Sequence, residues 1–169
     1  LEGGTWSVPS REGDRHANVT VGITTYNLPE DCLTQAERFQ AEPEVLDHIA
    51  EILIVDQGNK NVKDCERYPR LQEELGSKLR VIEQANLGGS GGFSRGMYEA
   101  LQDGVDYVLL LDDDVRVDPE GIVRAVTFAD LTRVPTIVGG HMFSMYERTM
   151  LHAYAEHIQP WRFWWEASK

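Results

Sequence analysis

The feature that most constrains the fold is a regular alternation of short β-rich runs with amphipathic stretches that have helical spacing. Strands separated by helices are joined by right-handed crossovers, which produce a parallel sheet. The sequence therefore predicts an α/β protein with a mostly parallel sheet and helices on both faces. We expect five strands, at residues 19–25, 51–56, 78–84, 106–114 and 135–143.

Proline and glycine residues between these runs mark where helices begin and end. Pro69 and Gly76 fit the first position and the C-terminal stop of one helix. Asp118 followed by Pro119 is a typical helix start. Pro43 predicts that the first connection is divided into two short helices.

Apolar side chains predict how two of these elements are buried. Phe93, Met97, Ala100 and Leu101 form a stripe with helical spacing, so we expect this stripe to face the core. Every residue from 107 to 111 is apolar, which is typical of a central strand covered on both faces.

The composition is that of one soluble globular domain. The chain has 169 residues, 41% of them hydrophobic, and a net charge of −12 from 16 Lys and Arg against 28 Asp and Glu. Because such an acidic surface repels phosphate backbones, we expect no nucleic-acid partner. The longest apolar run, Tyr107 to Leu111, is far shorter than the roughly 20 residues of a transmembrane helix, so we expect no transmembrane segment.

The two ends of the chain differ in character. Residues 1–17 lack periodicity and predict an irregular lead-in or the end of a preceding domain, whereas residues 18–169 predict the folded part.

Cys32 and Cys65 lie far apart, without the spacing of metal ligands or redox pairs. We interpret them as reduced, packed thiols of a cytosolic protein.

An aspartate triplet follows the fourth predicted strand, at the edge where parallel α/β sheets bind ligands. Side chains alternate along an extended segment, so Asp112 and Asp114 project together and Asp113 points the other way. Two carboxylates so close repel by about 1 kcal/mol in water and about 4 kcal/mol at an effective dielectric of 20, so they favour a proton or a divalent cation. Oxygen ligands favour Mg²⁺ or Mn²⁺. The alternative is an acidic turn that caps the next helix.

Other strand ends carry weaker signals. The glycine-rich segment 86–96 opens a helix whose free N–H groups suit a phosphate, although Ser94 and Met97 break the dinucleotide and P-loop patterns, and a flexible loop is the alternative. Asp56 and Gln57 suit contacts with a nucleobase or ribose, and an Asx turn with Gly58 is the alternative for Asp56.

His152 and Glu156 are four residues apart, so they share a face whether their segment is a strand or a helix. A metal or acceptor contact and a simple surface pair are both compatible with this spacing.

Taken together, the strand ends at residues 24–27, 56–57, 86–89 and 112–114 resemble those of the inverting family 2 glycosyltransferases, in order and spacing. More narrowly, residues 86–97 and the segments at 139–143 and 151–156 are similar to those of actinobacterial galactofuranosyltransferases, which build cell-wall galactan from UDP-galactofuranose. The resemblance runs from about Val19 to about Ile158 and implies a GT-A fold, which is Rossmann-like. It also implies that this chain is the front half of an enzyme, truncated at its C-terminus.

The resemblance implies a role for several residues. Asp112 and Asp114 would hold the Mn²⁺ or Mg²⁺ ion that carries the diphosphate, and Asp113 would touch the ribose or the donor sugar. The catalytic base and a metal-binding histidine would lie beyond Lys169, with Glu156 as a candidate base within this chain. Leu28 stands where some relatives have an arginine. The implied nucleotide-sugar contacts are Thr25, Asp56, Gln57, Asn86 and Gly88.

The implied function is transfer of galactofuranose from a UDP-sugar donor to a glycan or lipid-linked glycan acceptor. This reaction would take place in the cytoplasm, at the inner face of the plasma membrane, with peripheral association of the parent protein. The alternatives are another family 2 transferase, such as a rhamnosyltransferase, or a donor-binding module without transfer activity. A phospho-acceptor signalling domain is disfavoured because no lysine follows the last predicted strand, and a phosphatase because its Asp-x-Asp would follow the first strand.

Overall fold

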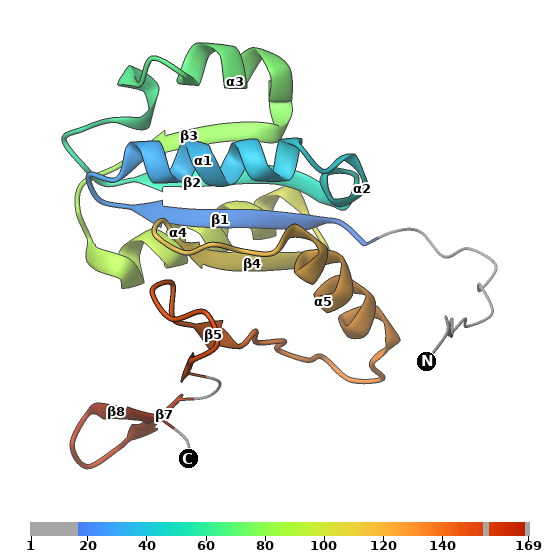
Figure 1. Cartoon of the computed structure of the whole chain (residues 1–169), viewed down its shortest axis with the longest axis vertical. Helices are drawn as coiled ribbons and strands as arrows, with labels where there is room; N and C mark the ends of the chain where they lie inside the picture. Colours follow the sequence, from blue (N-terminus) through green and yellow to red (C-terminus); the bar gives the residue numbers. More distant parts are fainter. Residues whose placement is uncertain (1–16, 154–155, 168–169) are drawn as a thin grey trace. The chain divides into compact units, whose positions relative to one another are not determined.

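The computed structural model describes residues 17–153 and 156–167. The chain divides into two compact units, one up to Thr127 and one from Phe128, which we describe separately (Figure 1). The predicted lead-in lies outside the described residues except for Ala17, which is buried in the core of the first unit. Among the helices of the described residues, none combines the length and apolar character that a membrane span requires.

The first unit contains a four-stranded sheet in the order β3-β2-β1-β4, and every neighbouring pair is parallel. This arrangement confirms the predicted α/β class and brings the carboxyl ends of all four strands to one edge. The strands are β1 (Val19–Thr25), β2 (Ile49–Asp56), β3 (Leu79–Glu83) and β4 (Tyr107–Asp112).

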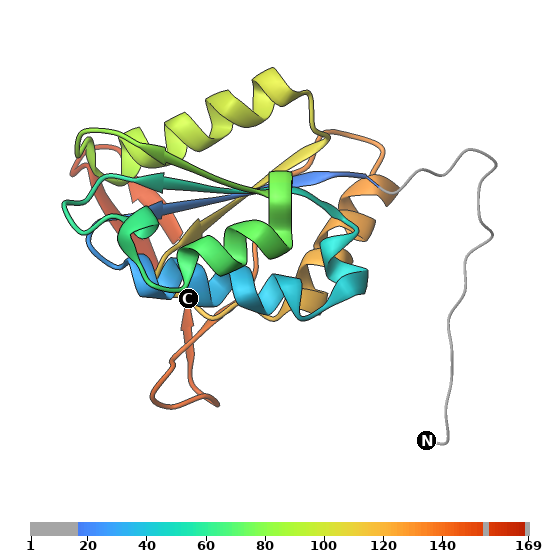
Figure 2. The ribbon, with the colours of Figure 1, turned by 90° about the horizontal axis from the view of Figure 1, so that it is seen from above.

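Helices cover both faces of this sheet, with α4 on one face and α1 and α3 on the other (Figure 2). The bounds confirm the predicted start at Pro119, the break at Pro43 and the stop at Gly76, whose φ of 56° suits glycine. The helices are α1 (Pro29–Gln40), α2 (Pro43–Leu46), α3 (Tyr68–Leu75), α4 (Gly88–Asp103) and α5 (Pro119–Leu131), and the 3₁₀ turns are η1 (Val62–Asp64) and η2 (Gly76–Lys78).

The main core lies between the sheet and α1. Alternate residues of β1 face it, and Ile23 packs there with Leu33 and Phe39 of α1 and with Ile52 and Ile54 of β2. All five side chains are fully buried, so this face supplies most of the hydrophobic stabilisation of the unit.

The opposite face packs against α4 through small residues, so the predicted apolar stripe is correct for Ala100, which is buried, and wrong for Met97 and Leu101. The buried positions of α4 are Gly92, Gly96 and Ala100, whereas Met97 is 38% exposed and Leu101 is more exposed still. A Cβ atom on Gly96 would lie 3.9 Å from Cα of Gly22 on β1, so helix and strand backbones approach closely. Large side chains do not fit between two backbones at this distance, and they are displaced to the flanks of the helix.

Two predictions about strands are also wrong. β4 is an edge strand of the sheet and not a central one. Its residues 107, 109 and 111 pack against the core, whereas Val108 and Leu110 on the other face are each 37% exposed. The two faces of β4 are therefore not covered equally. Of residues 135–143, only Met142–Phe143 forms a strand, β5, which pairs antiparallel with β6 (Leu151–Ala153). A proline and two glycines in this run weaken its strand preference.

The second unit contains a further antiparallel pair, β7 (Glu156–Gln159) with β8 (Trp164–Ala167). His152 lies on β6 and Glu156 on β7, in separate two-stranded sheets. The expectation that they share one face of a single element is therefore wrong, because a shared face requires an uninterrupted period.

Candidate functional site

The candidate site lies at the carboxyl edge of the sheet, where β4 ends beside the start of α4. Thr24 of β1 is in register with Asp112 of β4. Gly92, in the second turn of α4, packs directly on Thr24. These contacts bring the end of β4 and the glycine-rich start of α4 to the same part of the edge.

The aspartate triplet begins with the last residue of β4 and continues into a turn. Asp112 and Asp114 are exposed, whereas Asp113 is half-buried. Partial burial raises the pKa of Asp112, and the charges of Asp114 and then Asp113 raise it further. The charge of Asp114 thus acts on Asp112, two residues before it.

Asp113 also affects a group on α1. Burial raises the pKa of the Cys32 thiol on α1 to about 12, and the charge of Asp113 contributes to this rise. Asp113 and Asp114 lie in the turn after β4, so the strand alternation expected for the three aspartates ends at Asp112.

The donor set at the triplet fits a particular kind of metal site. Within residues 17–153 and 156–167, no group of three or more His, Cys, Asp or Glu side chains is placed to hold a metal ion. Mg²⁺ commonly binds through one or two carboxylates and completes its shell with water and phosphate oxygens. The Asp112–Asp114 pair therefore fits a cation shared with a phosphate ligand, and it does not fit a structural metal site made by protein alone.

Asp56, at the end of β2, is 1% exposed, and both of its carboxylate oxygens are engaged by the backbone. Its Oδ1 accepts a hydrogen bond from the Gly58 N–H at 2.9 Å, and its Oδ2 accepts one from the Val62 N–H at 2.8 Å. The Asx turn considered from the sequence is therefore present, and the carboxylate shapes the loop that follows β2.

Gln57 is 5% exposed, and its side-chain amide bonds the loop that leads into α4. Its Nε2 donates to the Gly88 carbonyl at 3.0 Å, and its Oε1 accepts from the Leu87 N–H at 2.9 Å. Oε1 also accepts from Nε2 of Gln84 at 3.1 Å.

The remaining predicted contacts differ in accessibility. Thr25 is buried, and its hydroxyl lies beside the thiol of Cys32. Asn86 is exposed, and its Oδ1 accepts from the Gly88 N–H at 2.9 Å. Gly88 is exposed too and has a φ of 68°, which suits glycine at the start of this helix. His152 and Glu156 are exposed residues of the second unit.

Two residues that organise this edge are missed by the sequence reasoning. Asn27 has a φ of 65°, and its Oδ1 accepts from the N–H groups of Asn59 and Lys60, so it ties together the loops after β1 and β2. Gln35 is buried on α1 and donates to the Val115 carbonyl, just beyond the aspartate triplet. A glutamine on the apolar face of a helix is the signal that could have indicated the second contact.

The fold and the edge define a Rossmann-like α/β protein with paired carboxylates beside a glycine-rich helix start. The family model described as "Glycosyltransferase like family 2" matches residues 16–165, and the chain belongs to this family. The parallel sheet with helices on both faces is consistent with a GT-A fold, and the resemblance found in the sequence is confirmed.

Within this family, the chain is similar to curated galactofuranosyltransferases. The chain is 37% identical over 169 residues to the galactofuranosyltransferase GlfT2 of Mycobacterium tuberculosis. The matched region covers 99% of this chain and 26% of the relative. It is 37% identical over 164 residues to GlfT2 of Mycolicibacterium smegmatis, with 96% and 25% covered. The galactofuranosyltransferase GlfT1 of M. tuberculosis is 32% identical over 96 residues, with 54% and 29% covered. The chain thus spans about a quarter of the length of these relatives.

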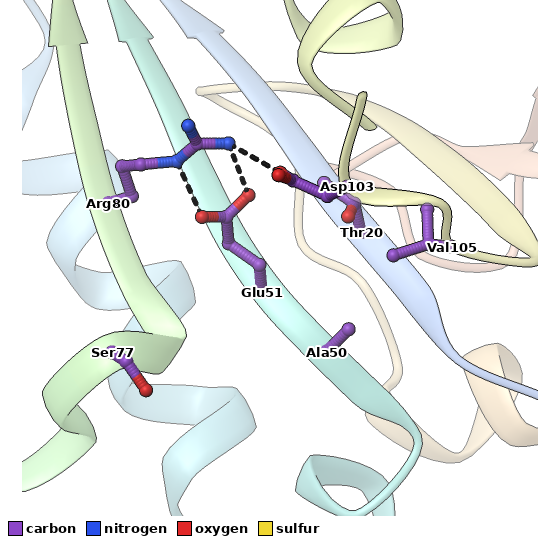
Figure 3. Close-up of a pocket in the computed structure, with 7 residues that line it drawn as sticks. All are labelled: Thr20, Ala50, Glu51, Ser77, Arg80, Asp103 and Val105. Atoms are coloured by element: carbon purple, nitrogen blue, oxygen red, sulfur yellow. Dashed lines mark hydrogen bonds and ion pairs between the residues drawn. The ribbon is translucent and has the colours of Figure 1, made fainter. Parts of the chain in front are cut away.

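A pocket formed by described residues lies away from this edge. It is a shallow hollow of about 380 Å³ lined by residues near the amino-terminal ends of the strands (Figure 3). The Arg80 guanidinium bonds both Glu51 and Asp103 there, so the charged groups of the hollow are already paired. The lining residues are Thr20, Ala50, Glu51, Ser77, Arg80, Asp103 and Val105.

Proposed function

We propose that this chain is the donor-binding part of a metal-dependent, inverting glycosyltransferase that transfers galactofuranose from UDP-galactofuranose to a cell-wall glycan. The observation that carries this proposal is the placement of Asp112, the last residue of β4, and of Asp114, two residues further on, at the carboxyl edge of the sheet beside the start of α4. The similarity of nearly the whole chain to galactofuranosyltransferases supports the choice of donor.

Electrostatics explain why such a site needs a cation. The chain has a net charge of −12, so a nucleotide diphosphate is repelled unless its charge is neutralised locally. A Mn²⁺ or Mg²⁺ ion held by Asp112 and Asp114 would neutralise the diphosphate and stabilise the charge that develops on the leaving UDP. The N–H groups at the start of α4 add the positive end of a helix dipole.

The accessible residues are assigned to direct contact with the nucleotide sugar. We assign Asn86 and Gly88 to the nucleotide and Asp113 to the ribose or donor sugar, since none of them is fully buried. Thr25 and Asp56 have buried side chains and end β1 and β2, so we propose that they support the uridine site by holding the loops that follow these strands. Glu156 is exposed on β7 and is the candidate within this chain for the base that deprotonates the acceptor hydroxyl.

The acceptor is proposed to be a glycan or a lipid-linked glycan, and the reaction to take place at the cytoplasmic face of the membrane, as the family resemblance implies. A second candidate is a donor-binding module without transfer activity of its own. This candidate is favoured by the coverage of the relatives, because the chain spans only about a quarter of their length.

Calorimetric titration with UDP, with and without Mn²⁺, tests the site. We expect binding that requires Mn²⁺ and is abolished in the double variant Asp112→Ala, Asp114→Ala. The matched control is Glu66→Ala, Glu73→Ala, which removes two exposed carboxylates from the region of α3 and makes the same change in net charge. Equal affinity for UDP in EDTA, or equal loss in both double variants, would overturn the metal site.

The identity of the sugar donor is tested with the same protein by comparing the affinities of several nucleotides and nucleotide sugars. We expect UDP-galactofuranose to bind more tightly than UDP-galactopyranose, and UDP more tightly than dTDP. Tighter binding of dTDP would favour a transferase for another sugar, such as rhamnose. Donor binding without sugar transfer to a galactan oligosaccharide would favour the donor-binding module.

A further inference from the structure

We infer that Gln57 is a positioning residue: its buried amide places the loop at residues 84–88 and the first turn of α4, and thereby sets donor affinity without touching the nucleotide. This inference rests on the proposed function, because it concerns the same edge of the sheet. It assigns the Gln57 side chain a role different from the direct uridine contact implied by the family resemblance.

The hydrogen bonds of Gln57 are the first support. One amide bonds two consecutive residues of the loop, because Oε1 accepts from the Leu87 N–H and Nε2 donates to the Gly88 carbonyl. Gln84 donates its own amide to the same Oε1. Most of the hydrogen-bonding capacity of the Gln57 amide is therefore used within the protein, which leaves little for a ligand.

The packing around this amide is the second support. Gln57 is 5% exposed, and its Nε2 lies 3.0 Å from the position that a Cβ atom on Gly92 would occupy. The amide is thus enclosed beneath the start of α4, beside the contact between Gly92 and Thr24. A nucleotide at the surface of this edge would meet Asn86 and Gly88 before it could reach Gln57.

The backbone of Gln57 is itself held in place. Its N–H donates to the Thr25 carbonyl at 3.0 Å, which continues the β1–β2 pairing by one residue. The preceding carboxylate of Asp56 organises the following loop through Gly58 and Val62. The backbone that carries the amide is therefore fixed to the central strands, and the hydrogen bonds of the amide fix the loop before α4 to the same strands.

Loss of the amide has a specific physical consequence. Without Gln57, the Leu87 N–H loses its acceptor and the Gly88 carbonyl loses its side-chain donor, and the Leu87 N–H regains a partner only if the loop moves toward water. The start of α4 would then shift relative to Asp112, whose strand is anchored to β1 through Thr24. Donor affinity would fall even though every residue that contacts the donor is still present.

Amide hydrogen exchange of the unliganded protein, combined with titration by UDP and Mn²⁺, tests this inference. In Gln57→Ala we expect the Leu87 amide to exchange at least tenfold faster, with unchanged exchange in β1 and β2, and UDP to bind at least tenfold more weakly. Gln57→Glu retains the acceptor for Leu87 and loses the donor for Gly88, so we expect intermediate values for both measurements.

Gln72→Ala is the matched control. Gln72 also bonds two backbone groups through its amide, the carbonyls of Gly76 and Leu79, but it lies on α3. We expect this variant to leave Leu87 exchange and UDP affinity unchanged. The inference is overturned if Gln57→Ala weakens UDP binding while Leu87 exchange stays the same, because the side chain would then act by direct contact.

The inference is also overturned if exchange rises equally in every strand, since Gln57 would then act on global stability alone. Failure of the proposed function has a different signature. In that case the unaltered chain does not bind UDP, and the exchange of Leu87 in Gln57→Ala still decides whether Gln57 positions the loop.

Discussion

Gly92 on α4 lies so close to Thr24 on β1 that a Cβ atom at position 92 would be 2.1 Å from Cγ2 of Thr24. No side chain of an L-amino acid fits there unless the helix moves. This contact sets how near the start of α4 lies to the end of the neighbouring strand β4, because Thr24 is in register with Asp112.

The variant Gly92→Ala should therefore be destabilised by about 2 kcal/mol or more, since overpacking of a close contact outweighs the helix preference of alanine. Urea denaturation measures the change. Gly89→Ala is the control, because its Cβ would meet only Phe93 at an ordinary distance of 3.8 Å. Rescue of Gly92→Ala by Thr24→Ser, which removes Cγ2, is also expected. Equal stability of the two alanine variants would contradict the prediction.

The same contact shows what sequence patterns could not predict. Helical spacing indicated a face made of Met97 and Leu101, since periodicity analysis assumes that large apolar side chains fill the core. The actual face depends on Gly22, a residue about 70 positions away that lets two backbones meet. The helix boundaries at Pro43, Gly76 and Pro119 depend on local signals, and these were predicted correctly, whereas the place of β4 at the edge of the sheet was not.

In the candidate site, too, the sequence predicts poorly the features that depend on distant partners or on where a strand ends. The alternation of Asp112, Asp113 and Asp114 was expected from strand geometry, but β4 ends at Asp112 and the next two residues form a turn. The roles of Asp56 and Gln57 depend on partners further along the chain, such as the N–H groups of Val62 and Leu87. A polar residue at a strand end looks the same in the sequence whether it binds a ligand or a loop.

The buried carboxylate of Asp56 leads to a second prediction. In Asp56→Asn, one of the two oxygens that accept backbone N–H groups is replaced by an amide donor, so one N–H loses its partner. We expect a loss of about 2 kcal/mol in the free energy of unfolding, measured by urea denaturation at pH 7. The exposed Asp64→Asn serves as control and should change stability by less than about 0.5 kcal/mol. Similar values for the two variants would argue against a structural role for Asp56.

Asp112 leads to a prediction about pH. Partial burial and the charges of Asp114 and Asp113 raise its pKa above the ordinary value of 3.8, so the folded chain binds this proton more tightly than the unfolded chain does. The ionised carboxylate therefore costs stability. This cost is absent below about pH 3.8, grows as the pH rises through the raised pKa, and is constant above it.

Asp112→Asn should accordingly be more stable than the unaltered chain at pH 7 in the absence of divalent cations. Because the group is largely accessible, screening limits the gain to about 0.5 kcal/mol. Thermal unfolding at pH 7 and pH 3 in EDTA measures it, with Glu73→Gln as an exposed control. A gain of the same size at pH 3 would show that the charge of Asp112 is not its cause.

Arg80 provides the last prediction, which concerns the attachment of α4 at its other end. Its guanidinium, on β3, bonds Glu51 of β2 at 2.6 Å and Asp103 of α4 at 2.8 Å (Figure 3). It also bonds Glu99 of α4 at 3.0 Å. The side chains of Glu51 and Glu99 are only 14% and 15% exposed. Removal of Arg80 therefore leaves neighbouring carboxylates poorly solvated and close to one another.

We expect Arg80→Ala to lose about 2 kcal/mol of unfolding free energy at pH 7, a value between those of exposed and buried ion pairs. Hydrogen bonds from Arg95 and Arg80 lower the pKa of Glu99, so the stability that this carboxylate contributes is present above its unfolded pKa and is lost as the pH falls through its lowered folded pKa. The deficit of Arg80→Ala should shrink over the same range. Arg124→Ala, which breaks an exposed pair with Glu120 on α5, should change stability little at either pH. A deficit of Arg80→Ala that is equally large at pH 7 and pH 2.5 would mean that packing of the arginine stem, and not its charge, holds the end of α4 to the sheet.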